Sequence, residues 1–120
     1  MAEIQTTILK RDMGSGYTDH ATLAYGDMFI LAIIESPVIL NNNITFTGIY
    51  IRPGRGIPFP STPTHKIANK FKAANVSMVK MGTELWVMIV THDVDPNHKD
   101  AEGKRPIHVE KAVIPNVFPS

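Results

Sequence analysis

Residues 76–92 have the sequence VSMVKMGTELWVMIVTH, and this stretch decides the fold class. Two runs of strand-favouring residues, 76–81 and 85–92, flank Gly82-Thr83, which is the spacing of a β-hairpin with a short turn. In the second run, residues 85, 87 and 89 are apolar and so are residues 86, 88 and 90. Because successive side chains of a strand point to opposite faces, this strand is apolar on both faces and is expected to be central in its sheet.

Apolar runs of strand length recur along the rest of the chain. Residues 28–34 are apolar without interruption, which is typical of a strand buried on both faces. Asn41-Asn42-Asn43 separates residues 38–40 from the β-branched and aromatic segment 44–52, and asparagine tolerates the backbone of tight turns, so a second hairpin is expected there. The predicted strands are 4–9, 17–25, 28–35, 38–40, 44–52, 76–81, 85–92 and 107–114.

One helix is predicted between these strands, over residues 64–75. Thr64 is a suitable N-cap, and the apolar residues after it fall at helical spacing, namely Ile67, Ala68, Phe71 and Ala74. Together the elements predict one domain, residues 1–120, that is mostly β: a sandwich or small barrel of about seven strands with one short helix. The alternative is an α+β sheet covered by that helix.

The composition excludes several classes of function. The chain has no cysteine, which removes disulfides, thiolate catalysis, iron–sulfur clusters and cysteine-ligated zinc. Its longest apolar run, residues 28–34, is far shorter than the roughly 20 residues of a membrane-spanning helix. The amino terminus lacks the basic and apolar stretches of a signal peptide, so we expect an intracellular protein without a membrane segment.

Charge is distributed unevenly along the chain, although the net charge is only +1. Residues 36–83 carry six basic residues and no acidic residue, whereas the flanking segments 1–35 and 84–120 have net charges of −3 and −2. The basic segment is therefore a candidate for binding an anionic partner such as nucleic acid or a nucleotide. The alternative is that its charges are matched by acidic residues within the molecule or on a second subunit.

The basic segment begins with a loop rich in proline, glycine and arginine, residues 52–63. Arginines on a glycine-loosened backbone are suited to phosphates, and neighbouring aromatic rings are suited to stacking on bases. The loop has neither the Walker sequence nor the Gly-x-Gly-x-x-Gly fingerprint, so no phosphate-binding motif is present. The candidate residues for an anion or partner are Tyr50, Arg52, Arg55, Phe59, Lys66, Lys70 and Lys72.

A second candidate site is the loop of residues 92–100, which concentrates imidazoles and carboxylates. Asp93, Asp95 and Asn97 match the first three ligand positions of a calcium-binding loop. The match ends there, because position six is His98 instead of glycine and position twelve is Lys104 instead of glutamate. Two imidazoles with a carboxylate would instead suit a divalent transition metal, possible as a cofactor of a metal-dependent enzyme. The candidate ligands are His92, Asp93, Asp95 and His98. The alternative is a solvated loop with ordinary turn chemistry.

No set of residues has the arrangement of a catalytic site, and we assign none. The sequence is instead best explained by a small non-enzymatic binding or assembly module that forms a homo-oligomer, for example as a structural or accessory part of a larger assembly such as a viral one. We expect contacts through apolar strand faces, the loop of residues 52–63 and the carboxy-terminal arm, residues 115–120. Nucleic-acid binding and metal-dependent catalysis are the competing hypotheses.

Overall fold

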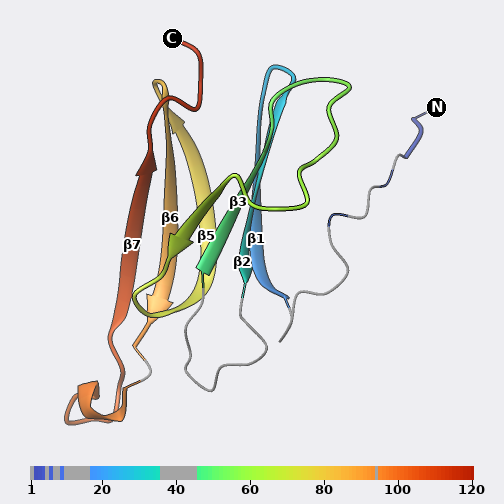
Figure 1. Ribbon diagram of the computed structural model, residues 1–120. Coiled ribbons are helices and arrows are strands. Elements are labelled where there is room, and N and C mark those ends of the chain that lie inside the picture. Colours follow the sequence, from blue (N-terminus) through green and yellow to red (C-terminus); the bar gives the residue numbers. More distant parts are fainter. Residues whose placement is uncertain (1, 5, 7–8, 10–16, 36–45, 94) are drawn as a thin grey trace.

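A computed structural model describes the chain except for residues 1, 5, 7–8, 10–16, 36–45 and 94. The described residues form two antiparallel sheets that pack face to face as a β-sandwich (Figure 1). The four-stranded sheet has the order β1-β2-β3-β4 and consists of β1 (Tyr17–Tyr25), β2 (Met28–Glu35), β3 (Phe46–Arg52) and β4 (His65–Ala68). The three-stranded sheet has the order β5-β6-β7 and consists of β5 (Lys72–Met81), β6 (Glu84–His92) and β7 (Ile107–Ile114).

The hairpin predicted from residues 76–92 is confirmed. β5 and β6 pair in antiparallel register, and Gly82 in the turn between them has a φ of 62°, a conformation that glycine adopts without strain. β6 is the central strand of its sheet, as expected. The sandwich prediction is also confirmed, because no pairing among the described strands closes either sheet into a barrel.

The core lies between the two sheets and is built from alternate residues of their strands. The four-stranded sheet contributes Ile30 and Ile34 of β2 and Ile49 of β3, and β6 contributes Leu85 and Ile89 from the other side. All five side chains are fully buried. Burying one such side chain contributes roughly 1.5–3 kcal/mol, so this contact between the inner faces dominates the stability of the fold.

The helix predicted over residues 64–75 is wrong. Residues 65–68 form β4, residues 69–71 turn the chain, and β5 begins at Lys72. Ile67 lies opposite Thr47 of β3 and packs against the core. The apolar spacing that resembled a helix therefore belongs to two short strands and the bend between them. Pairing with β3 satisfies the backbone of β4, and this tertiary contact overrides the local pattern.

Helical structure in the described part of the chain is limited to one short turn, η1 (Pro96–His98). None of the described residues belongs to a helix long and apolar enough to cross a membrane. Two further predicted elements fall wholly or partly outside the described residues. The segment 38–40 and the asparagine turn after it lie outside the described residues, and the described residues 4, 6 and 9 of the predicted first strand belong to no strand.

The predicted loop of residues 52–63 corresponds to the segment 53–64 between β3 and β4, since Arg52 ends β3, and this segment packs on the outer face of the four-stranded sheet. Phe59 contacts Phe29 of β2 edge to face, with ring centroids 5.5 Å apart. A Cβ atom at Gly48 of β3 would lie 3.3 Å from Cγ of Pro63, so the loop approaches the strand closely. Thr64 ends the loop beside β3, where its backbone N–H donates to the carbonyl of Ile49 at 2.7 Å. The loop therefore covers its own sheet.

The carboxy-terminal arm also folds back on its own domain. The backbone N–H groups of Val117 and Phe118 both donate to the carbonyl of Thr83 in the β5–β6 turn, at 2.9 and 3.1 Å. Phe118 is 3% exposed and meets Tyr25 edge to face, with ring centroids 5.5 Å apart. The ammonium of Lys80 lies over both rings. In Figure 1 this arm lies at the upper end of the three-stranded sheet, beside the turn between β5 and β6.

Candidate interaction surface

The outer face of the three-stranded sheet is apolar and largely exposed. β6 alternates strictly, because Leu85, Val87 and Ile89 are fully buried while the residues between them face outward and are half-buried. On β7 the exposed fractions of Ile107 and Val109 are 74% and 70%. We define the apolar face as Val79, Met81, Trp86, Met88, Val90, Ile107, Val109 and Val113.

The pairing register makes this face continuous across all three strands. Trp86 of β6 lies opposite Val79 of β5 on one side and Val113 of β7 on the other, and Val90 lies opposite Val109. Isolated apolar residues are common on protein surfaces, but a contiguous apolar patch marks an interaction surface. The apolar face is therefore the strongest candidate surface in the described part of the chain.

One cation lies within the apolar face. Lys111 of β7 is placed with its ammonium 4.2 Å from the centroid of the Trp86 ring, a cation–π geometry. The indole N–H of Trp86 donates to a carboxylate oxygen of Glu84 at 3.2 Å. The polar end of the tryptophan is thus satisfied within its own sheet, while its ring keeps Lys111 close to the strands.

The two rows of side chains on β7 differ in character and in the direction they face. Ile107 and Val109 face outward, whereas His108 and Glu110 face the interior and are only partly exposed. His108 stacks on Phe71, with ring centroids 4.2 Å apart. Glu110 accepts hydrogen bonds from the backbone N–H groups of Lys70 and Phe71 at 2.8 and 3.4 Å. These contacts stabilise polar residues on the inner side of β7.

Tyr50 does not form part of an accessible anion site, because it is fully buried on the outer face of the four-stranded sheet. Its hydroxyl donates to the carboxylate of Glu35, with oxygens 3.1 and 3.2 Å away, and Glu35 is itself 4% exposed. Phe59 is half-buried against Phe29. Of the two aromatic residues predicted to stack on a ligand, Tyr50 is bonded to Glu35 within its own sheet, and Phe59 holds the loop of residues 53–64 on that sheet.

The two predicted arginines make contacts within the molecule. Arg52 donates from Nε to the carbonyl of Gly54 at 3.2 Å, and Arg55 forms an ion pair with Asp27 at 3.2 Å. Both partners of that ion pair are mostly exposed, so the pair contributes little to stability. The ion pair between Arg55 and Asp27 agrees with the alternative interpretation, in which basic residues are matched by acidic residues of the same molecule.

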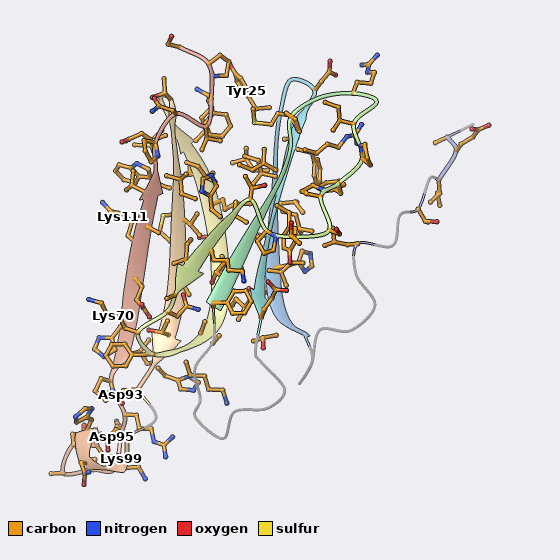
Figure 2. All side chains as sticks on the ribbon, viewed as in Figure 1. Tyr25, Lys70, Asp93, Asp95, Lys99 and Lys111 are labelled. Atoms are coloured by element: carbon orange, nitrogen blue, oxygen red, sulfur yellow. The ribbon has the colours of Figure 1, made fainter. Side chains whose placement is uncertain are left out.

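The predicted lysines lie apart from the arginines. Asp27, the partner of Arg55, lies in the β1–β2 turn at one end of the sandwich, whereas Lys70 follows β4 near the other end (Figures 1 and 2). Lys66 lies over the ring of Phe46, and Lys70 and Lys72 are exposed. The seven candidate residues therefore do not converge on one site.

The acidic loop after β6 forms a hydrogen-bonded turn. His98 contacts Asp93 through Nδ1 at 2.5 Å and lies 3.7 Å from Asp95 through Nε2. Asp93 accepts the backbone N–H of Asp95, and Asp95 accepts that of Asn97, both at 2.9 Å. Both nitrogens of this imidazole face carboxylates of its own loop (Figure 2 labels the two aspartates).

The electrostatics of this loop follow from the same contacts. The backbone N–H of Asp95 and the imidazole of His98 lower the pKa of Asp93, against the opposing effect of desolvation. The hydrogen bond to Asp93 and the nearby carboxylates raise the pKa of His98. Within the described residues, no group of three or more His, Asp or Glu side chains is arranged to hold a metal ion. The geometry gives the set of His92, Asp93, Asp95 and His98 no support as a metal site.

Sequence reasoning missed two carboxylates that connect the sheets. Asp19 of β1 accepts the backbone N–H of Val76 at 2.8 Å and the side-chain amide of Asn75 at 3.0 Å, beside a bulge in β5. Glu110 has the equivalent role between β7 and the bend after β4. A single acid within a strand pattern was the only signal for either residue, and it does not reveal the partner.

Comparison of the chain with protein-family models, with characterised proteins and with solved structures finds no match.

Proposed function

We propose that this protein is a small binding and assembly module that self-associates through the apolar face. The observation that carries the proposal is the orientation of β7, whose Ile107 and Val109 are exposed while His108 and Glu110 face inward. An eight-residue strand that places its aliphatic row in solvent loses the free energy of burying it, and a second subunit would recover that free energy.

Two other elements expected to contact a partner are engaged within the chain. The loop of residues 53–64 packs on the four-stranded sheet, and the carboxy-terminal arm is anchored on the β5–β6 turn with Phe118 buried. The apolar face lacks an equivalent cover in the described part of the chain, as its exposed valines and isoleucine indicate. These contacts support an interface on the three-stranded sheet rather than on the loop or the arm.

The dimensions of the face set the expected strength of the interaction. The three strands have ten, nine and eight residues, and the length that all three share covers roughly 400 Å², given the usual strand spacing and rise. That is about half of what each partner contributes to an interface of standard size. We therefore expect a concentration-dependent dimer with a dissociation constant on the order of micromolar. The net charge of +1 means that two copies repel each other weakly.

Sedimentation velocity over a concentration series tests this proposal. We expect Val109→Glu to weaken self-association by at least about tenfold, because it places an unpaired charge in a desolvated interface. Ile4→Glu is the matched control, since Ile4 is 90% exposed and lies outside the apolar face. A wild-type protein that stays monomeric at about millimolar concentration, or a Val109→Glu protein that associates as strongly as wild type, would refute the proposal.

The anionic-ligand hypothesis is a weaker second proposal and rests on Lys70 and Lys72, which are exposed near the bend after β4. It predicts retention on heparin that decreases steeply with salt and is lost in the Lys70→Ala, Lys72→Ala double variant. The arginines are not included in this variant because both contact groups in their own chain.

A further inference from the structure

The edge of the three-stranded sheet at β7 is the second feature that we consider. The sandwich has edge strands at both of its sides. β1 and β5 adjoin at one side, where Asp19 of β1 accepts the backbone N–H of Val76. At the other side β4 and β7 are the edge strands. β7 pairs with β6 alone among the described strands, so the opposite edge of its backbone has no strand partner there.

A hollow of about 320 Å³ lies beside this free edge. Its walls come from β4 and the bend after it, from β6 and from β7, and its lining residues are Ile67, Ala68, Lys70, Ile89, Val109, Glu110, Lys111 and Ala112. Its apolar part is made by Ile67, Ala68, Ile89, Val109 and Ala112. The charged residues of the lining are Lys70, Lys111 and Glu110, so cations outnumber carboxylates by two to one. Glu110 accepts the backbone N–H groups of Lys70 and Phe71, which holds its carboxylate against the bend after β4. Figure 2 shows Lys70 and Lys111 along the same side of β7.

We propose that β7 accepts an extended acidic peptide as a fourth strand of the three-stranded sheet, with one peptide side chain in the hollow. Strand addition of this kind uses the unpaired backbone of an edge for affinity and alternate side chains for specificity. β7 offers eight residues, which is longer than the usual strand and sufficient for such pairing. This inference does not rest on the self-association proposal, because the backbone of the peptide pairs with the edge of β7 in the plane of the sheet, and its outward side chains extend the apolar face beyond Val109 and Val113 without covering it.

The pattern of the peptide follows from the residues of β7. In antiparallel or parallel pairing, neighbouring side chains on one face interact, and opposite charges stabilise the pair. The outward row of β7 reads Val109, Lys111, Val113, so the preferred partner row is apolar, acidic, apolar. The inward row of the peptide meets the hollow, where a small aliphatic side chain fits between Ile67 and Ala112. Lys70 adds a second attraction for an acidic peptide.

A second copy of β7 is a poor occupant of the same edge. In a symmetric antiparallel pair one residue lies opposite its own copy on the two-fold axis. The registers that use most of the strand place Glu110 opposite Glu110 or Lys111 opposite Lys111. Like charges directly opposite each other destabilise a strand pair. Pairing of β7 with a second copy of β7 is therefore disfavoured, and an acidic strand of different sequence is favoured.

The experiment uses the full chain and synthetic peptides of about ten residues, a length that spans the edge strand. The probe alternates valine with alanine and has one central glutamate in the valine row; the matched control has lysine in place of that glutamate. Binding is measured by fluorescence anisotropy of the labelled peptide. We expect the glutamate peptide to bind about fivefold or more tightly than the lysine peptide, since cross-strand charge pairs contribute up to about 1 kcal/mol.

Two further measurements locate the contact. Lys111→Glu should reverse the preference between the two peptides, and replacing central peptide residues by proline should abolish binding, because proline cannot donate to a strand ladder. Amide hydrogen exchange should slow for residues 107–114 when the glutamate peptide is bound. Val79→Glu, which alters the apolar face on β5, should leave peptide binding unchanged even if it prevents self-association.

Three outcomes would overturn the inference. One is the absence of binding of the glutamate peptide at about millimolar concentration, where a weak strand addition is still detectable. Another is equal affinity of the glutamate and lysine peptides for the wild-type chain. The third is binding with no change in amide exchange on β7, which would place the peptide elsewhere. If the protein binds the peptide but stays monomeric, the result supports strand addition and refutes only the self-association proposal.

Discussion

The outer faces of the two sheets are built from similar strands but differ in exposure: one is covered by a loop of the chain and the other is exposed. On the four-stranded sheet, Tyr50 and Glu35 are buried and the loop of residues 53–64 packs over the strands. On the three-stranded sheet, Ile107 and Val109 are exposed in solvent. The comparison shows that the chain supplies a cover for one face from its own sequence. The other face has no such cover among the described residues, and it is the face through which we propose self-association.

The largest effect is expected where the covered face is most deeply buried. Tyr50→Ala removes a fully buried ring and takes the hydroxyl donor away from Glu35, so we expect unfolding to become easier by about 3–5 kcal/mol. Urea denaturation measures the change. Tyr50→Phe keeps the ring and should lose only about 1–2 kcal/mol. Equal losses for the two variants would show that the ring packing carries little of the effect.

Gly48→Ala tests the close approach of the loop to the same face, with a smaller expected effect. A Cβ atom at this position would lie 2.5 Å from Oε2 of Glu35 and 3.1 Å from Cε1 of Tyr50. Because both neighbours are buried, relieving the clash must disturb the covered face, and we expect a loss of about 1–3 kcal/mol. Gly54→Ala is the control, since nothing lies within 4 Å of its position. A Gly48→Ala protein as stable as wild type would show that the face is loosely packed.

A pH titration examines the loop that joins β6 to β7. The pKa of His98 is raised in the folded state above its ordinary value of 6.5, so the contact stabilises the fold fully below that value and the benefit is lost as the pH rises through the folded pKa. The pKa of Asp93 is lowered, so its contribution is present above its ordinary value of 3.8 and is lost as the pH falls through the folded pKa.

The difference in melting temperature between wild type and His98→Gln should therefore be largest between the ordinary pKa values of the two groups, in mildly acidic solution. It should shrink above neutral pH and again in strong acid. Lys99→Gln is a control on the adjacent exposed residue. A difference that stays constant from acidic to alkaline pH would mean that the ion pair does not stabilise the loop in solution.

The smallest effect on stability is expected on the exposed face. Ile107→Thr changes a side chain that is 74% exposed and so should alter the free energy of unfolding by no more than about 0.5 kcal/mol. Denaturation at a protein concentration below self-association measures it. A loss as large as that of Gly48→Ala would indicate that the face is covered in the monomer, and the contrast between the two sheets would fail.

Much of the strand content could be predicted from the sequence because it depends on local pattern. The hairpin around Gly82 and the central position of β6 follow from alternating and two-sided apolar runs. The helix predicted over residues 64–75 is wrong because its four apolar residues match helical spacing by chance. Ile67 pairs with Thr47, which lies 20 residues earlier in the sequence, so a pattern of neighbouring residues does not reveal this contact. The candidate anion residues failed to converge for the same reason.

The sequence by itself determined that this chain folds as a β protein without disulfides, and which residues of each strand share a face. It did not determine which face lies inside. The alternation of β7 groups Ile107 with Val109 and His108 with Glu110, and either row could have joined the core. The tertiary structure decided the matter, because the backbone N–H groups of Lys70 and Phe71 donate to Glu110 inside the sandwich and the ring of Phe71 stacks on His108. Nε2 of His108 is buried without a hydrogen-bond partner among the described residues, so this imidazole is held by stacking. Partial burial of the Glu110 carboxylate is tolerated because these donors exist, and they come from a part of the chain that is about 40 residues away.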